Sequence, residues 1–228
     1  MTRGLRGVRR PRAAAVLAAG LVLGLTGCAG IGQPAPYDSP GINGLVIPTP
    51  TPAPGDFVDG VDNPWLPLAP GTRWTYDVTE GAATRGRIDV DVLDDTVPVA
   101  GLEATAVQTT ADLGGGAPSV ATRLYAQDGA GNVWLVGSDS DDASWRAGAA
   151  GAEAGLAMPA DPRLGDGWLS YDVPSLPRAS ATIEDQSSEL VQLRNEAGTT
   201  TRAVYEKGVG LVGLQDLDAG WTAELVAG

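Results

Sequence analysis

Histidine is absent from this chain of 228 residues, and cysteine occurs once, as Cys28. Without histidine, the Ser-His-Asp and Cys-His nucleophile systems are excluded, and so are zinc sites with imidazole ligands. A single cysteine excludes a disulfide within the monomer. The chain therefore lacks the groups on which most familiar hydrolases and zinc sites depend.

Basic residues are also scarce, with 15 Lys and Arg against 28 Asp and Glu. Five of the arginines precede Cys28, so the chain from Cys28 onward carries a formal charge of −18. This charge disfavours nucleic acid, which is bound by neutralising phosphates, and it disfavours an anionic membrane surface unless lipid tethers the protein. We expect no nucleic-acid partner.

The first 27 residues have the features of an export signal. Arginines are concentrated before residue 13, and the apolar segment 13–27 is too short to span a bilayer. Leu25-Thr26-Gly27-Cys28 resembles the lipobox of bacterial lipoproteins. This resemblance implies a signal peptide at 1–27 and lipid on the Cys28 thiol and amine, and hence anchorage on the extracytoplasmic face of the cell membrane. The alternative is an ordinary secretory signal with a chance cysteine.

Composition divides the remaining chain into two parts. Residues 28–56 are nearly free of charge and hold seven prolines, which favours an extended, disordered stalk behind the lipidated cysteine. From residue 57 to 228 the hydrophobic pattern is continuous. We expect a single folded domain at 57–228.

Apolar and polar residues alternate with period two in much of this domain, which is typical of β-strands with one wet face. The expected strands are 72–79, 85–92, 103–110, 121–127, 133–136, 189–193, 200–206 and 211–217. Short glycine-bearing segments at 128–132 and 195–198 predict hairpins. Only 147–158 is rich enough in alanine for a short helix, and its three glycines oppose one. We expect a mainly β fold: a single antiparallel sheet curled into a barrel or half-barrel, or alternatively a β-sandwich.

Four blocks resemble a functionally uncharacterised family of bacterial, and from the composition actinobacterial, secreted proteins and lipoproteins. The first, residues 63–76, follows N-P-x-x-P-L-x-P-G-T-x-W-x-Y, and the second, 125–134, follows Y-A-Q-D-x-x-G-N-V-W. The third spans 144–159 and the fourth 205–212. The chain departs from the pattern at Leu135 and Ser138, where the resemblance implies an aromatic residue and a glutamate. The resemblance implies a family and no activity.

Six tryptophans dominate the aromatic content of the folded region. The strand patterns place Trp74 and Trp134 inside the sheet, whereas Trp65, Trp145 and Trp168 adjoin proline, polar or glycine-rich segments that suit the mouth of a cleft. Core packing is the simpler interpretation of each. The candidate ligand-binding residues are Trp65, Trp74, Trp134 and Trp145.

Acidic residues offer two further hypotheses. Asp139, Asp141 and Asp142 gather hard oxygen ligands in one expected loop, a candidate calcium site that lacks the EF-hand spacing. Paired carboxylates can also cleave glycosidic bonds, and Glu103, Asp128, Glu184 and Glu206 are candidates. For each of these acids, a solvated surface carboxylate is the simpler interpretation.

The glycine pattern at 208–213 matches G-x-G-x-x-G, but too few residues follow it to complete a dinucleotide-binding unit.

Taken together, the features of the sequence favour a non-enzymatic ligand-binding or carrier module for an apolar small molecule or cell-envelope component, with no required cofactor apart from the calcium hypothesis. The alternatives are a carboxylate-dependent hydrolase of envelope polysaccharide and a structural or protein-interaction module of the cell surface.

Overall fold

A computed structural model describes residues 53–141 and 143–226. The expected signal peptide, Cys28 and nearly all of the expected stalk lie outside the described residues, as does Asp142. Regular structure in the described part is β apart from one 3-10 turn, η2 (Pro54–Asp56). None of its residues forms a helix long and apolar enough to cross a membrane.

Fourteen strands form one sheet in which all paired strands are antiparallel. The strands are β1 (Phe57–Val58), β2 (Arg73–Glu80), β3 (Ala83–Val99), β4 (Leu102–Asp112), β5 (Ser119–Asp128), β6 (Val133–Ser140), β7 (Ser144–Arg146), β8 (Glu153–Met158), β9 (Gly167–Asp172), β10 (Ala179–Gln186), β11 (Leu190–Glu196), β12 (Thr200–Glu206), β13 (Gly210–Asp216) and β14 (Thr222–Leu225).

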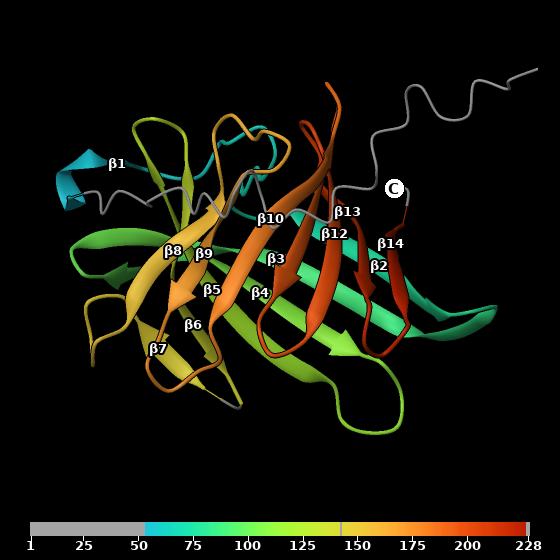
Figure 1. The fold of residues 1–228 in the computed structure, drawn as a ribbon. Helices are drawn as coiled ribbons and strands as arrows, with labels where there is room; N and C mark the ends of the chain where they lie inside the picture. Colours follow the sequence, from blue (N-terminus) through green and yellow to red (C-terminus); the bar gives the residue numbers. More distant parts are fainter. Residues whose placement is uncertain (1–52, 142, 227–228) are drawn as a thin grey trace, which may run out of the picture. The chain divides into compact units, whose positions relative to one another are not determined.

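Twelve of these strands close into a ring in the order β5-β4-β3-β2-β14-β13-β12-β11-β10-β9-β8-β6, and β6 pairs again with β5. Most neighbours in the ring are consecutive in the chain, so the colours in Figure 1 change gradually from strand to strand. β1 pairs with the end of β5, and β7 pairs with the end of β6. The prediction of one curled antiparallel sheet with little helix is confirmed.

The ring is not an even barrel, because the number of paired residues differs between neighbouring strands. β3 and β4 are joined through ten residue pairs, whereas β8 and β9 are joined through only two. Gly155 of β8 sits at this short joint, and a Cβ added there would lie 2.3 Å from the Ser170 carbonyl carbon. The ladder between β8 and β9 therefore has the fewest paired residues in the ring.

All eight expected strands are present, and both expected hairpins are confirmed between β5 and β6 and between β11 and β12. The sequence analysis missed β1, β7, β8, β9, β10 and β14. Residues 147–158, the one candidate for a short helix, instead form a turn followed by β8. Gly148 and Gly151 in that turn have φ of +80° and +76°, values that interrupt a helix.

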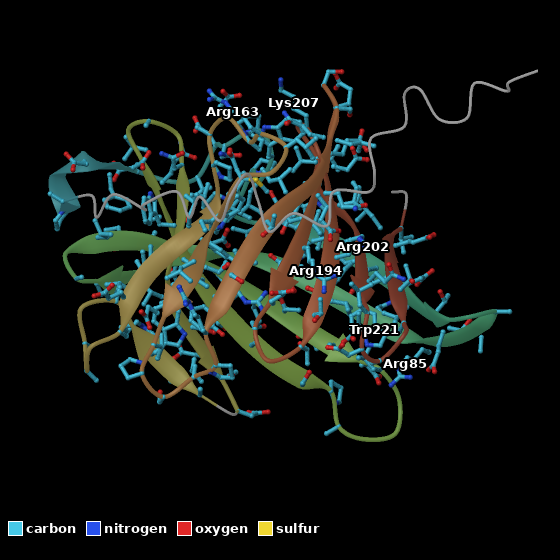
Figure 2. All side chains as sticks on the ribbon, viewed as in Figure 1. Arg85, Arg163, Arg194, Arg202, Lys207 and Trp221 are labelled. Carbon is cyan, nitrogen blue, oxygen red and sulfur yellow. The ribbon has the colours of Figure 1, made fainter. Side chains whose placement is uncertain are left out.

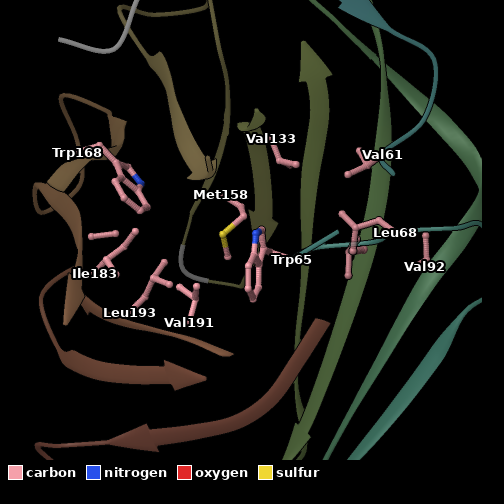
Figure 3. Packing of buried hydrophobic residues seen from close by; sticks show 12 residues of the cluster. Val61, Trp65, Leu68, Val92, Val133, Met158, Trp168, Ile183, Val191 and Leu193 are labelled. Atoms are coloured by element: carbon pink, nitrogen blue, oxygen red, sulfur yellow. The ribbon is translucent and has the colours of Figure 1, made fainter. Parts of the chain in front are cut away.

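The main hydrophobic core lies inside the ring. It joins buried residues from β3, β4, β6 and β8 to β11, among them Val92, Val133 and Leu193. The segment between β1 and β2 enters this core with Val61, Trp65 and Leu68, and Figure 3 shows Trp65 and Met158 between the two sides of the ring. This segment between β1 and β2 therefore supplies buried side chains to the core although it is not a strand.

Asn63 holds the entering segment in place. Its side chain is 1% exposed, and its Oδ1 accepts hydrogen bonds from the backbone amides of Trp65 at 2.8 Å and Leu66 at 3.2 Å. Its Nδ2 donates to the carbonyls of Gly131 at 2.8 Å and Pro159 at 3.2 Å. One buried amide thus connects three separate segments of the chain.

Candidate ligand-binding site

A pocket of about 360 Å³ lies where β8 and β9 separate beyond their two paired residues. Its wall comes from the hairpin turn before β6, from β6, β8 and β9, and from the loop 159–166 that joins the last two. The lining residues are Ala130, Asn132, Trp134, Leu156, Pro159, Ala160, Asp161, Arg163, Asp166 and Trp168. This pocket therefore lies beside the shortest ladder of the ring.

Two tryptophans among these residues differ in their hydrogen bonding. Trp134 is 3% exposed, and its Nε1 donates to Oδ2 of Asp128 at 2.9 Å. Trp168 is also 3% exposed, but its Nε1 is buried without an acceptor in the described part of the chain. Figure 3 shows this nitrogen facing the core side, toward Met158. A buried indole N–H without an acceptor is unfavourable, so a ligand that supplied one would gain binding energy.

The loop 159–166 is held to the sheet at both ends. At its start, the Ala160 amide donates to Oδ1 of Asn132 at 3.0 Å. At its end, the Gly165 amide donates to the Ile183 carbonyl, and the Ile183 amide donates to the Asp166 carbonyl. The pocket rim is therefore part of the folded structure.

The charged residues of the rim belong to this loop. Asp161 and Arg163 form an ion pair of 2.8 Å, with both side chains more than 70% exposed, and Figure 2 shows Arg163 projecting from the loop. Desolvation raises the pKa of the Asp166 carboxyl, and the charge of Asp161 raises it further, whereas Arg163 and a backbone hydrogen bond act in the opposite direction. The rim thus combines one solvated ion pair with one carboxyl that holds its proton more tightly than usual.

The structure brings one of the four candidate tryptophans, Trp134, to this pocket. Trp65 is 5% exposed in the core beneath Lys207, whose Nζ lies 5.7 Å from its ring centroid. Trp74 is partly buried inside the ring. Trp145 packs against Tyr171 with ring centroids 5.5 Å apart.

Trp168 was considered for a cleft mouth but was not among the candidate ligand-binding residues, and the rim residues were not identified at all. Trp134 and Trp168 are far apart in sequence and meet only through the pairing of β6 with β8 and of β8 with β9. Asp161, Arg163 and Asp166 belong to a loop with no alternating pattern. The sequence offered no signal for this meeting beyond the polar and glycine-rich surroundings of Trp168.

The three carboxylates of the calcium hypothesis are not shown together. Asp139 accepts two hydrogen bonds from the Arg146 guanidinium, at 2.9 and 2.6 Å, and these bonds hold the pKa of its carboxyl below the usual value. Asp141 is exposed, and Asp142 lies outside the described residues. No group of three or more potential metal ligands is found within 53–141 and 143–226.

The four carboxylates considered for glycosidic cleavage have other surroundings. Glu103 accepts from the Thr96 hydroxyl at 2.8 Å, and Glu184 accepts from Nε of Arg202 at 2.9 Å. Glu206 is exposed. None of them lines the described pocket.

Asp128, the remaining candidate, organises the hairpin turn beside the pocket. It is 7% exposed, and its carboxylate accepts from the amides of Ala130 and Asn132, from the Asn132 side chain and from Trp134. Burial acts to raise the pKa of Asp128, but these hydrogen bonds to the charged form outweigh it, so the pKa is lowered. Its carboxylate is therefore committed to holding Asn132 and Trp134 in place.

Comparison with known proteins gives one structural neighbour to report. The crystal structure of a putative lipoprotein from Parabacteroides distasonis ATCC 8503 matches with a TM-score of 0.39 and 10% sequence identity, over 74% of this chain and 98% of that one. No family model matches the chain, and no curated protein matches it in sequence.

Proposed function

We propose that this protein is a non-enzymatic ligand-binding or carrier module that takes a small, mainly apolar molecule in the pocket beside Trp168. The observation that carries the proposal is the pocket lined by Trp134, Leu156 and Trp168, whose buried Nε1 lacks an acceptor in the described chain. Ligand pockets commonly have volumes of roughly 300–1,000 Å³ and few polar groups. The ligand class that fits is a small apolar body with one hydrogen-bond acceptor.

Native mass spectrometry tests this proposal on residues 28–228 with Cys28→Ala, which carries no lipid. We expect an additional non-covalent mass that denaturing extraction removes. Trp168→Phe, which keeps an aromatic ring and removes the N–H, should lower its occupancy, whereas Trp221→Phe, in a different core cluster, should not. A protein of the calculated mass, with no retained ligand, would contradict the carrier function and favour a surface interaction module.

We further propose that lipid on Cys28 holds the protein on the extracytoplasmic face of the cell membrane. Support comes from the lipobox-like residues and the charged and apolar segments before them. In the source bacterium, the wild-type chain should remain with the membrane fraction, and its N-terminal peptide should carry the mass of a diacylglyceryl group. Cys28→Ala should appear in the medium or remain uncleaved. A wild-type chain with an unmodified Cys28 would contradict the anchor.

One observation favours a second function, carboxylate-dependent hydrolysis of envelope polysaccharide. Asp161 and Asp166 both line the pocket, and the pKa of the Asp166 carboxyl is raised, as a general acid requires. Asp166→Asn should abolish the release of reducing ends from purified cell-wall polysaccharide, and Asp185→Asn should not. Equal activity of Asp166→Asn and wild type, or no activity in either, would exclude Asp166 as the acid.

We also infer that the four blocks of the family resemblance form a structural signature. Asn63 of the first block bonds to Gly131 of the second and Pro159 of the third, and the Gly208 amide of the fourth block donates to the Pro64 carbonyl at 2.6 Å. The blocks thus meet at one end of the ring, where they fix the segment that enters the core. Membership of the family stays a prediction.

A further inference from the structure

Arg123 projects into the ring. It lies on β5 directly opposite Val107 of β4, in a ladder without register shifts. Residues directly opposite one another in an antiparallel pair share a face of the sheet. Val107 belongs to the core inside the ring and is 7% exposed, so Arg123 faces the same interior.

This arginine is without an ion-pair partner in the part of the chain that the structure describes. Seven other arginines each form a salt bridge with an aspartate or glutamate, including Arg194 and Arg202 on the neighbouring strands β11 and β12. Arg123 also makes no side-chain hydrogen bond there, yet it is exposed. Arg123 therefore combines a strand position that faces inward with a side chain that water reaches.

Two phenols lie in the same region. Tyr125 is two residues further along β5, and Tyr205 comes from β12, six strands away around the ring. Withdrawal from water raises the pKa of Tyr205, the Tyr125 phenol raises it further, and the Arg123 guanidinium acts in the opposite direction. Tyr125 and Tyr205 both pack against the core cluster that contains Val107, so the two phenols face the same interior as Arg123.

Neither of these two hydroxyls has a hydrogen-bond partner within the described residues, whereas the nearby Tyr76 hydroxyl donates to the Leu211 carbonyl at 2.8 Å. Partly buried apolar side chains of Trp74 and Val90 belong to the two core clusters inside the ring. A guanidinium and two phenols without partners, beside an accessible apolar surface, match an anionic head joined to an apolar body.

We propose that Arg123, Tyr125 and Tyr205 form an anion-binding site inside the ring that takes the carboxylate of an amphipathic ligand, whose apolar part lies against Trp74 and Val90. The guanidinium offers two parallel N–H donors to the carboxylate oxygens, and the phenols supply further donors. This site shares no residue with the pocket beside Trp168. It adds a second binding activity, and either site can exist without the other.

Isothermal titration calorimetry with dodecanoate below its micellar concentration tests the proposal, using residues 28–228 with Cys28→Ala as the reference. Dodecanol has the same tail without the charge, and dodecyltrimethylammonium has the opposite charge. We expect dodecanoate to bind at least about tenfold more tightly than either. Arg123→Gln should weaken dodecanoate binding about tenfold or more and leave dodecanol binding unchanged.

Arg178→Gln provides the matched control, because Arg178 is exposed in a loop outside the strands and its substitution changes the net charge equally. It should bind dodecanoate as the reference protein does. If Arg123→Gln does not fold, as judged by circular dichroism, the double variant Tyr125→Phe with Tyr205→Phe replaces it and should weaken dodecanoate binding several-fold.

Three outcomes would each overturn the proposal: equal affinity for dodecanoate and dodecanol, variants that bind dodecanoate as tightly as the reference protein, or no binding of dodecanoate. Trp168→Phe should leave dodecanoate binding intact, which separates this test from that of the proposed pocket.

Discussion

At the scale of single residues, Asn63 contributes more to the architecture than its size suggests. All the polar atoms of its buried side chain are used, in two accepted and two donated hydrogen bonds. Asn63→Ala would leave two backbone amides and two carbonyls without these partners. We expect a loss of about 2–4 kcal/mol in the free energy of unfolding, measured by urea denaturation.

Asn195→Ala is the control for this prediction, because Asn195 lies in β11 and makes no side-chain hydrogen bond within the described residues. Its effect should stay within about 0.5 kcal/mol. Equal losses for the two variants would mean that the bonds of Asn63 contribute little to stability.

Asp128 gives a prediction about pH. Its pKa is lower in the folded protein than its ordinary value, because hydrogen bonds to the charged carboxylate outweigh the effect of burial. The resulting stabilisation is present above the pKa of the unfolded chain and is lost as the pH falls through the folded pKa. Asp128→Asn should therefore be less stable than wild type by about 1–3 kcal/mol at pH 7, and the difference should shrink in acid.

Urea denaturation across the acid range measures this difference. Asp59→Asn is the control, because Asp59 is exposed and makes no side-chain hydrogen bond in the described region. Its difference from wild type should stay within about 0.5 kcal/mol at each pH. A gap between Asp128→Asn and wild type that stayed constant with pH would show that ionisation of Asp128 does not stabilise the fold.

At the scale of elements, the joint between β8 and β9 depends on Gly155. A Cβ at this position would lie 2.4 Å from the Leu169 carbonyl oxygen and 2.5 Å from the Tyr171 nitrogen, so the strands would have to separate. Gly155→Ala should destabilise the protein by about 2–4 kcal/mol and speed amide hydrogen exchange in β8 and β9 before other strands.

Gly167→Ala is the matched control on β9, because an added Cβ there would meet its nearest neighbour, Oγ1 of Thr182, at 3.4 Å. Its cost should remain below about 1 kcal/mol. Unchanged exchange in β8 and β9 of Gly155→Ala would show that the ring accommodates a wider joint.

Elements also show where sequence reasoning succeeded and failed. β2 was predictable because Trp74, Tyr76 and Val78 alternate with polar residues and point into one core. β8 was not, because Gly155 and small residues weaken its pattern, and a register shift where β6 pairs with β8 breaks the period of two. The pocket forms at this irregular part of the ring. The sequence therefore suggested Trp134 as a ligand-binding candidate and Trp168 for the mouth of a cleft, but it could not place the two together or identify the rim.

At the scale of the whole described sheet, closure of the ring depends on β14. This strand pairs with β13 through three residue pairs and with β2 through four, so it joins the two ends of a meander. It also carries Ala223, which is 1% exposed, into the core beside Tyr76 and Val78. Without β14, β2 and β13 would become open edges with unpaired backbone groups.

A chain that ends at Leu217 should therefore lose cooperative thermal unfolding and associate through its open edges, as measured by circular dichroism and size-exclusion chromatography. A chain shortened only by residues 227 and 228 is the control and should behave as wild type. Because the missing strand would bind mainly through backbone hydrogen bonds, a synthetic peptide of residues 218–228 should restore a cooperative transition in trans. A cooperative, monomeric chain ending at Leu217 would show that the meander is stable as an open sheet. In that case closure would serve to enclose the interior that Arg123 faces, and the loss would appear in dodecanoate binding instead of stability.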